Sequence, residues 1–330
     1  MQRILNMALI DNGQSDENLP SSKKRECIFG PVPSRRLGRS LGVDLVPFKT
    51  CTYDCIYCQL GRTTNKTLQR KEWLPFDEII SQLKEKLHLK PDYITLSGSG
   101  EPTLFLRCGE LINKIKEITN IPIAVLTNGS LLWLPEVRKS LLEADVVIPS
   151  LDAGSDRLFQ YVNRPHQDIS FDKMLDGLVK FHNEYEGKYW LEVFLLAGVT
   201  TTKMEINRLK TCISSIQPDK VQVNTVTRPP AESFAEPVPK ELLESLAAQL
   251  FEHSDVIADY RGIHEKQEFT SQRDDVLTLL KRRPCTVEDI ASGLGLHRNE
   301  VLKYIEELSV QGKIERKQGP AQLYYKAVIQ

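Results

Sequence analysis

The sequence predicts an α/β fold, with a parallel sheet or barrel of about six β/α units followed by a small C-terminal domain that has the layout of a winged helix. Two patterns lead to this prediction. From about Ser40, short runs rich in Val, Ile and Leu alternate with amphipathic stretches of helical length. Strands that are apolar throughout are typical of parallel sheets covered on both faces. After about residue 270, three short helical patterns precede a hairpin pattern.

Six apolar runs are predicted to be strands, and five stretches between them are predicted to be helices. The strand candidates are residues 40–47, 92–98, 121–127, 145–152, 189–199 and 220–227. The helix candidates are residues 76–89, 108–119, 134–144, 171–185 and 203–216. Because crossover connections between parallel strands are right-handed, this alternation favours a parallel sheet or barrel. Six units are fewer than the eight of a complete TIM barrel.

The remaining segments divide the chain into four regions. Residues 1–26 are expected to form a flexible polar arm, and residues 27–230 hold the β/α units. Residues 231–270 are expected to hold a connector and a helix, with a Pro-rich stretch at 228–239 and an amphipathic stretch at 240–253. The winged-helix pattern occupies residues 271–330, with helices at 272–283, 286–296 and 297–314 and a hairpin at 315–327.

The composition is that of an ordinary globular protein. Hydrophobic residues make up 41% and the net charge is −1 over 330 residues, so no overall charge attracts nucleic acid or membranes. The N-terminal residues show no signal-peptide pattern, and no run approaches the roughly 18 apolar residues of a membrane span. We therefore expect a cytoplasmic protein with no membrane partner. In that compartment clustered cysteines favour metal binding or catalysis over disulfides.

Residues 49–64, KTCTYDCIYCQLGRTT, carry three of the seven cysteines at the spacing C-x3-C-x2-C, namely Cys51, Cys55 and Cys58. A tight loop can direct three sulfurs to one site, and thiolates favour soft metals and iron–sulfur clusters. The loop follows the first predicted strand, at the edge where α/β proteins bind ligands. The physical interpretation is a [4Fe–4S] cluster that is held by three thiolates and keeps one iron open at the mouth of the barrel.

Two other interpretations of these cysteines remain open. They could be buried structural thiols, or three ligands of a zinc site that needs a fourth. The nearest other candidates for that ligand are Cys27 and His88. No second cluster is predicted, because the other cysteines lie far apart and are better interpreted as structural thiols: Cys27, Cys108, Cys212 and Cys285.

The C-x3-C-x2-C spacing, with the aromatic Tyr57 before the last cysteine, resembles the signature of the radical S-adenosylmethionine (SAM) superfamily. The resemblance implies a partial (β/α)6 barrel and a [4Fe–4S] cluster whose open iron is chelated by the amino and carboxylate groups of SAM. It further implies reductive cleavage of SAM to a 5′-deoxyadenosyl radical, with an electron donor such as flavodoxin or ferredoxin. The expected enzyme is an iron–sulfur oxidoreductase or transferase.

Segments at later strand ends resemble further motifs of this superfamily. Residues 97–104, SGSGEPTL, resemble its GGE motif, which contacts the methionyl amine of SAM, and they differ from it by one serine. The resemblance covers roughly residues 28–230. The cofactor contacts that it implies are Tyr57, Ser99, Gly100, Glu101, Asn128, Ser150, Asp152 and Val199. No catalytic residue is predicted.

Each of these motifs also has a structural interpretation. Gly-Glu-Pro at 100–102 can be a turn with a capping acid, Thr-Asn-Gly at 127–129 is a common turn, and Ser-Leu-Asp at 150–152 can cap the following helix. Their recurrence at the ends of consecutive strands favours the functional interpretation.

The sequence features that predict a substrate class are weaker. Residues 29–51 and the NRP segment at 163–165 resemble a subgroup of uncharacterised iron–sulfur oxidoreductases related to the tRNA wybutosine-synthesis radical enzymes. The favoured hypothesis is therefore modification of a macromolecule such as a tRNA base. The alternatives are radical modification or activation of a protein or peptide, and a non-enzymatic redox regulator that binds DNA.

Basic residues occur in two places where a partner could bind. Six lie between residues 23 and 39, and they could contact a phosphate-bearing substrate or an electron donor, or form local ion pairs: Lys23, Lys24, Arg25, Arg35, Arg36 and Arg39. The residues after 270 carry ten Lys and Arg against eight Asp and Glu, which is weak for nucleic-acid binding. Tyr324 and Tyr325 of the hairpin could contact nucleic acid or pack in the core.

Overall fold

The computed structural model describes residues 26–34, 36–258, 273–296, 298–319 and 322–328. The predicted N-terminal arm lies outside the described residues apart from Glu26, and so do Arg35 and the end of the predicted 231–270 region. Among the described residues, no helix is long and apolar enough to cross a membrane.

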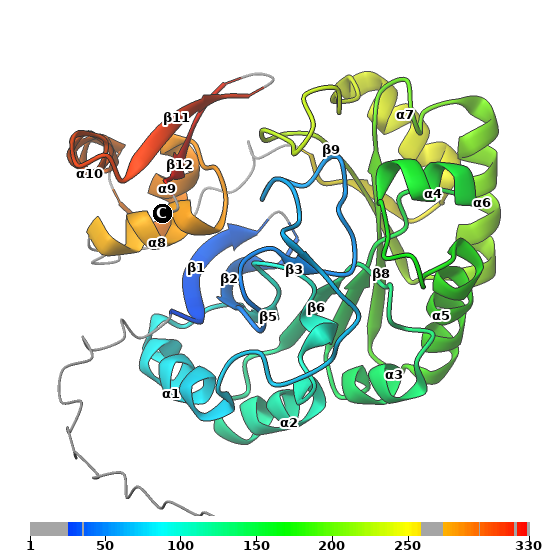
Figure 1. The fold of residues 1–330 in the computed structure, drawn as a ribbon, viewed down its shortest axis with the longest axis horizontal. Coiled ribbons are helices and arrows are strands. Elements are labelled where there is room, and N and C mark those ends of the chain that lie inside the picture. The colour runs from blue at the N-terminus through cyan, green and yellow to red at the C-terminus, as the bar shows by residue number, and fades with distance from the viewer. Residues whose placement is uncertain (1–25, 35, 259–272, 297, 320–321, 329–330) are drawn as a thin grey trace, which may run out of the picture.

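The centre of the fold is an eight-stranded sheet with the order β1-β2-β5-β6-β7-β8-β9-β10 (Figure 1). All neighbours pair in parallel from β2 to β10, and only β1 is antiparallel to its neighbour. The strands are β1 (Ile28–Ser34), β2 (Gly38–Val43), β5 (Tyr93–Leu96), β6 (Ile123–Thr127), β7 (Val146–Pro149), β8 (Lys188–Leu195), β9 (Lys220–Thr225) and β10 (Ser254–Val256). The six predicted strands are β2 and β5 to β9, so the α/β prediction is confirmed.

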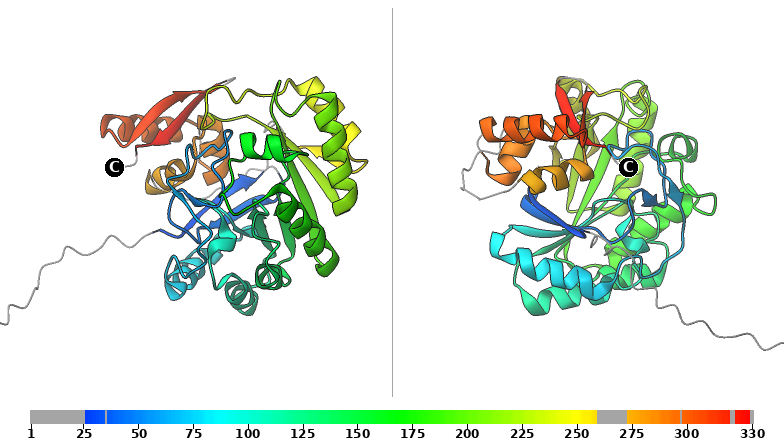
Figure 2. Two further views of the ribbon diagram at one scale, coloured as in Figure 1. Left: turned by 45° about the vertical axis from the view of Figure 1, so that its right-hand side comes forward. Right: turned by 60° about the vertical axis from the view of Figure 1, so that its left-hand side comes forward.

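Helices cover the outer face of this curved sheet, as the views in Figures 1 and 2 show. They are α1 (Phe76–Lys86), α2 (Cys108–Ile118), α3 (Pro135–Leu141), α4 (Asp156–Val162), α5 (Phe171–Glu184), α6 (Lys203–Ile216) and α7 (Lys240–Leu250). In α5, buried Phe171, Met174, Leu178 and Phe181 recur at helical spacing, and Ser170 caps the first turn by accepting from the Lys173 N–H. This spacing turns one apolar stripe of the helix toward the sheet.

Among the strands of the eight-stranded sheet and the α-helices that accompany it, β1, α4 and β10 were not predicted, and each has a weak sequence signal. Strand β1 contains Gly30 and two prolines, and in a sequence these residues are typical of a loop. An edge strand nevertheless tolerates them. Helix α4 has only two turns. Strand β10 has three residues and no buried side chain, yet it extends the sheet beyond the predicted boundary at residue 230.

Three helices and a hairpin follow, as the sequence predicts. They are α8 (Arg273–Arg282), α9 (Val287–Leu294), α10 (Arg298–Val310), β11 (Ile314–Gln318) and β12 (Leu323–Ala327). We call their described residues, from 273 to 328, the C-terminal unit. Its core includes Leu280, Ile290 and Val301, together with Phe29 and Val32 of strand β1. The unit therefore packs directly on the edge strand of the barrel (Figures 1 and 2).

The hairpin tyrosines are part of this packing. Tyr324 and Tyr325 are only 3% and 7% exposed, and the Tyr324 hydroxyl donates to the carbonyl oxygen of Thr227, just after β9. The idea that these two rings face a nucleic acid is therefore wrong, and the alternative of core packing is correct.

Candidate functional site

A cavity of about 400 Å³ lies inside the sheet, and residues of β2 and of all five parallel strands from β5 to β9 line it. The three cysteines line it too, as do Arg282 and Arg283 at the end of helix α8. The cavity thus brings together the first barrel loop, the later strand ends and the C-terminal unit.

The loop of residues 51–58 is held at both ends by backbone contacts. Strand β3 (Thr50–Cys51) pairs in parallel with β4 (Asn65–Lys66). Within the loop, the Cys58 N–H donates to the Cys55 carbonyl at 3.2 Å, and the Gly61 N–H donates to the Cys58 carbonyl at 3.0 Å. These bonds bend the chain so that all three sulfurs line one cavity.

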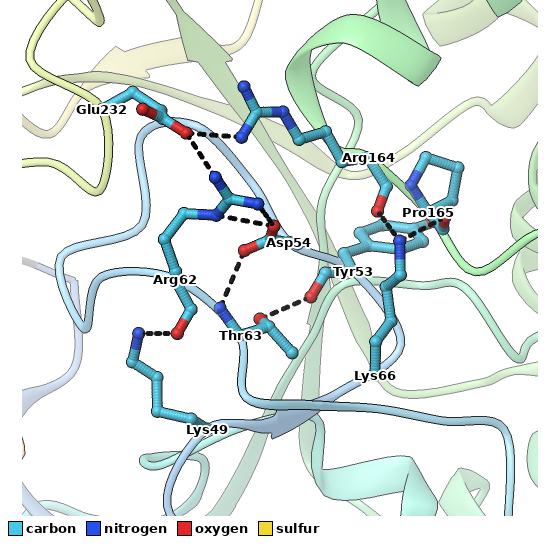
Figure 3. A network of polar contacts seen from close by, with 9 residues as sticks. All are labelled: Lys49, Tyr53, Asp54, Arg62, Thr63, Lys66, Arg164, Pro165 and Glu232. Carbon is cyan, nitrogen blue, oxygen red and sulfur yellow. Dashed lines mark hydrogen bonds and ion pairs between the residues drawn. The ribbon is translucent and has the colours of Figure 1, made fainter.

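A network of polar side chains fastens this loop to two others (Figure 3). Arg62 Nε donates to Asp54 at 2.8 Å, and Arg62 and Arg164 donate to the same oxygen of Glu232 at 2.8 and 2.5 Å. Lys66 donates to the carbonyl oxygen of Arg164 at 3.3 Å. The Arg62 side chain is 59% exposed, so each of its ion pairs adds little stability alone. Together they join the cysteine loop to the segments after α4 and after β9.

Two asparagine side chains donate to the cysteine sulfurs. The Asn128 amide lies 3.5 Å from Cys51 Sγ, and the Asn163 amide lies 3.5 Å from Cys55 Sγ. Donors at these distances favour a negatively charged sulfur. Asn163 is a site residue that the sequence analysis missed. Its sequence signal is the NRP segment at residues 163–165.

The surroundings of the three thiols disfavour the charged thiolate form unless a positive partner is bound. Burial, together with the nearby Glu101 carboxylate, raises the pKa of Cys51 to about 12. Burial also raises the pKa values of Cys55 and Cys58. Such thiols lose their protons readily only when metal binding compensates the charge. Three thiols from one loop, two with amide donors, therefore fit an iron–sulfur cluster.

The zinc interpretation finds no support in the described residues. There, no group of three or more His, Cys, Asp or Glu side chains gathers as tightly as a single metal ion requires. Each thiolate of a [4Fe–4S] cluster binds a different iron, so a cluster does not need that convergence. Cys27 is fully buried and His88 contacts the carbonyl of Glu85, and neither is among the described residues that line the cavity.

The other cysteines are scattered, buried thiols, as expected. Cys27, Cys108 and Cys285 are fully buried and Cys212 is 6% exposed, and all seven cysteines are free of disulfides.

The SGSGE segment follows β5 and lies against the cysteine loop. Glu101 is 2% exposed, and its carboxylate accepts from the hydroxyls of Thr103 and Thr127, both at 2.6 Å, and from the Asn128 N–H at 2.8 Å. It also accepts from the Thr103 N–H and so caps the short 3-10 helix η2 (Pro102–Leu104). The structural interpretation of this motif therefore holds, and Ser99, Gly100 and Glu101 also line the cavity.

Asp152 acts through neighbouring side chains. Its carboxylate accepts from the Tyr57 hydroxyl at 2.5 Å and from the Asn163 amide at 2.7 Å, and Tyr57 stacks on Phe194 at 4.0 Å. Burial raises the pKa of Asp152 to about 6. Asp152 is therefore positioned to orient Tyr57 and Asn163, both of which lie next to the cysteine loop.

Six of the eight predicted cofactor contacts line the cavity, namely Tyr57, Ser99, Gly100, Glu101, Asn128 and Ser150. Asp152 and Val199 are not among its described lining residues. Val199 packs beside buried Ile56 and Leu196, under the loop. The sequence placed both residues at the right strand ends but could not show which way their side chains point.

A second polar group in the cavity was not predicted as a site. Arg36 donates to Glu192 at 2.7 Å, and Asn224 donates to the other oxygen of Glu192 at 2.9 Å. The signal was a glutamate in the mostly apolar strand KYWLEVFL, because a glutamate is almost never fully buried unless it is paired. Arg36 therefore forms an ion pair within the protein, which is one of the alternatives given above for the basic residues. Arg39 instead binds the carbonyl oxygens of residues 89 and 90.

Comparison with known proteins gives a consistent result. Residues 45–206 match the Radical SAM superfamily. A UPF0026 protein of Methanocaldococcus jannaschii is 32% identical over 308 residues, which are 90% of this chain and 94% of the relative. A UPF0026 protein of Helicobacter pylori J99 is 34% identical and covers 83% and 87% of the two chains. A Brachyspira hyodysenteriae protein named GTPase Obg is 40% identical over 305 residues, but the chain spans only 45% of its length.

Solved structures share the fold at low sequence identity. A radical SAM methyltransferase from Sphaerobacter thermophilus aligns with a TM-score of 0.50 and 17% identity, covering 66% of this chain and 65% of the other. Streptococcus suis SuiB bound to S-adenosylmethionine aligns with a TM-score of 0.50 and 14% identity, covering 66% and 50%. At these identities the likeness shows the fold alone.

Proposed function

Since the chain belongs to the radical SAM superfamily, we propose that Cys51, Cys55 and Cys58 hold a [4Fe–4S] cluster and that the protein cleaves SAM reductively. The observation that carries this proposal is the set of three thiols from one loop, which line one cavity with the SGSGE segment. When bound, the cluster would supply the one electron needed for reductive cleavage of a carbon–sulfur bond of SAM, which yields methionine and a 5′-deoxyadenosyl radical able to take a hydrogen atom from the substrate.

The residues of this chain bind and orient the reactants. Asn128 and Asn163 hold two of the sulfurs through their amide groups. We propose that Ser99, Gly100 and Ser150 contact SAM from the strand ends, and that the Tyr57 ring, stacked on Phe194, shields one side of the cavity from water. Glu101 and Asp152 act mainly by holding these groups in place, because their oxygens already accept several hydrogen bonds.

Anaerobic reconstitution tests the reaction directly. The protein is loaded with iron and sulfide, reduced with dithionite and supplied with SAM, and we expect it to release 5′-deoxyadenosine. A well-loaded protein that releases none would contradict the proposal. In the cell, an electron donor such as flavodoxin or ferredoxin would replace dithionite in the cytoplasm, where thiols stay reduced.

We further propose that the C-terminal unit is a winged helix and that the substrate is RNA, with a tRNA base as the reacting group. The observation that favours RNA is the charge of the exposed hairpin. Lys313, Arg316 and Lys317 are exposed, and Tyr324 on the paired strand donates to the carbonyl oxygen of Thr227, which lines the cavity. A basic strand pair beside the cavity would hold a phosphate backbone near the reacting centre.

The RNA proposal predicts salt-dependent binding that depends on the hairpin. Replacement of Lys313, Arg316 and Lys317 by glutamine should weaken tRNA binding and reduce the slope of log K against log salt by up to about 2–3. Filter binding or fluorescence anisotropy across a salt series measures both quantities. The matched control replaces three exposed lysines of the outer helices, Lys139, Lys180 and Lys210, and should change neither. If wild-type protein binds no tRNA at low salt and instead retains one protein partner after RNase treatment, a protein or peptide is the substrate.

A further inference from the structure

Arg282, the last residue of helix α8, reaches from the C-terminal unit into the barrel cavity. Its guanidinium forms an ion pair with Asp44 and donates to Ser99 Oγ at 3.0 Å. It also lies over the ring of Phe29, at 5.1 Å from the centroid. The side chain is only 12% exposed, so these contacts are made largely out of water.

Asp44 links Arg282 to the SGSGE segment. It is fully buried, and its carboxylate accepts from the Ser99 N–H at 2.7 Å and from the Ser99 hydroxyl at 3.0 Å. Gly98 has a φ of 121°, and an added Cβ there would lie 2.0 Å from Asp44 Oδ1, so the carboxylate fits tightly against this turn. The Ser99 carbonyl in turn accepts from the Lys49 N–H at 2.7 Å, two residues before the first cysteine.

A second contact joins the C-terminal unit to the other end of the cysteine loop. Arg228, 4% exposed, donates to Gln59 at 3.3 Å, directly after Cys58. Its other nitrogen lies 3.8 Å from Asp289, which forms the capping box of helix α9 with Thr286. The unit is thus tied to the cysteine loop through Arg228 and to the SGSGE segment through Arg282.

We propose that Arg282 is a positioning residue for SAM, through which the C-terminal unit holds the SGSGE segment in its binding conformation. This inference rests on the proposed function, because it takes Ser99 and its neighbours as the SAM contacts. The buried Asp44 carboxylate needs a compensating charge, and Arg282 supplies it from a separate unit of the chain. Docking of that unit and binding of SAM are therefore coupled, so the unit is part of the active site as well as a module for recognising substrate.

The test compares two substitutions of Arg282 in the full-length, reconstituted protein. R282Q removes the charge. R282K retains the charge for Asp44, but a single ammonium cannot reproduce the planar fork that reaches Asp44 and Ser99 together. Anaerobic equilibrium dialysis with labelled SAM should show a dissociation constant raised about tenfold in R282Q and by a smaller factor in R282K. Kinetics should show the same increase in KM for SAM, while kcat at saturating SAM changes less than about twofold.

The control is R298Q, which breaks an exposed ion pair with Glu288 in the same unit and should bind SAM like the wild type. Iron content and melting temperature accompany each measurement. If R282Q loses its cluster or its fold, R282K decides, because it keeps the charge that Asp44 requires. Wild-type affinity for SAM in a folded R282Q protein, or in R282K where R282Q does not fold, would overturn the inference. Failure of the wild-type protein to bind SAM would instead overturn the proposed function.

Discussion

Replacement of Cys58 by alanine is expected to abolish both the iron–sulfur absorbance and the release of 5′-deoxyadenosine. Cys58 is one of three thiols that line the cavity, and it is the last residue of the C-x3-C-x2-C spacing. With two thiolates left, the remaining sites on the cluster would be open to water, and a cluster with so few protein ligands is lost on desalting. Visible absorbance and iron content, measured after anaerobic reconstitution and desalting, check the first result.

The matched control is Cys212→Ala in helix α6. Cys212 is a buried thiol outside the cavity, and its removal deletes one small side chain from the core. We expect a loss of stability of about 1 kcal/mol with full cluster content and activity. A Cys58→Ala protein that retained a stable cluster would show that the ligands have been assigned wrongly.

Replacement of Gly100 by alanine is expected to reduce cluster content about tenfold and to lower the free energy of unfolding by about 3 kcal/mol. A Cβ on Gly100 would lie 1.8 Å from the carbonyl oxygen of Thr50 and 2.9 Å from a methyl of Val46. The same carbonyl accepts from the Glu101 N–H at 3.1 Å, so it cannot move without losing that bond. Because Thr50 precedes Cys51, any shift that relieves the clash moves the first sulfur.

Gly312→Ala is the control for this prediction. Gly312 has a φ of 64° after helix α10, and an added Cβ would have no atom within 4 Å. Its substitution should cost only the strain of the left-handed conformation, about 1 kcal/mol, and should leave iron content unchanged. Chemical denaturation of the apoproteins and iron analysis of the reconstituted proteins separate the two effects. Equal iron content in both variants would mean that the contact between Thr50 and Gly100 does not control the cysteine loop.

The elements that could be predicted are those with a strong local pattern. The apolar strands from β5 to β9 and amphipathic helices such as α5 appear within a few residues of their predicted bounds, because burial on both faces or on one stripe determines their composition. Strand β1 could not be found in this way. It is stabilised by pairing with β2 and by the C-terminal unit, and its own residues include prolines that usually interrupt strands.

The residues of the site can be separated in the same way, into those with a local sequence pattern and those without one. Cys51, Cys55 and Cys58 were found because three thiols lie within eight residues, and local spacing is visible in a sequence. Glu192 and Arg282 line the cavity from two different elements, and Asn163 contacts Cys55 from the end of helix α4. Nothing in their own neighbourhoods shows which partner each side chain will meet.

The sequence by itself determined the alternation of parallel strands and helices, the resemblance to the radical SAM superfamily and the cysteine loop, since periodicity and residue spacing are properties of short segments. Only the tertiary structure decided that Asp152 points at Tyr57, that Tyr324 is buried, and that Arg282 enters the cavity of the barrel. Those outcomes depend on long-range packing, in which a buried carboxylate such as Asp44 must be compensated by whatever cation the fold brings to it.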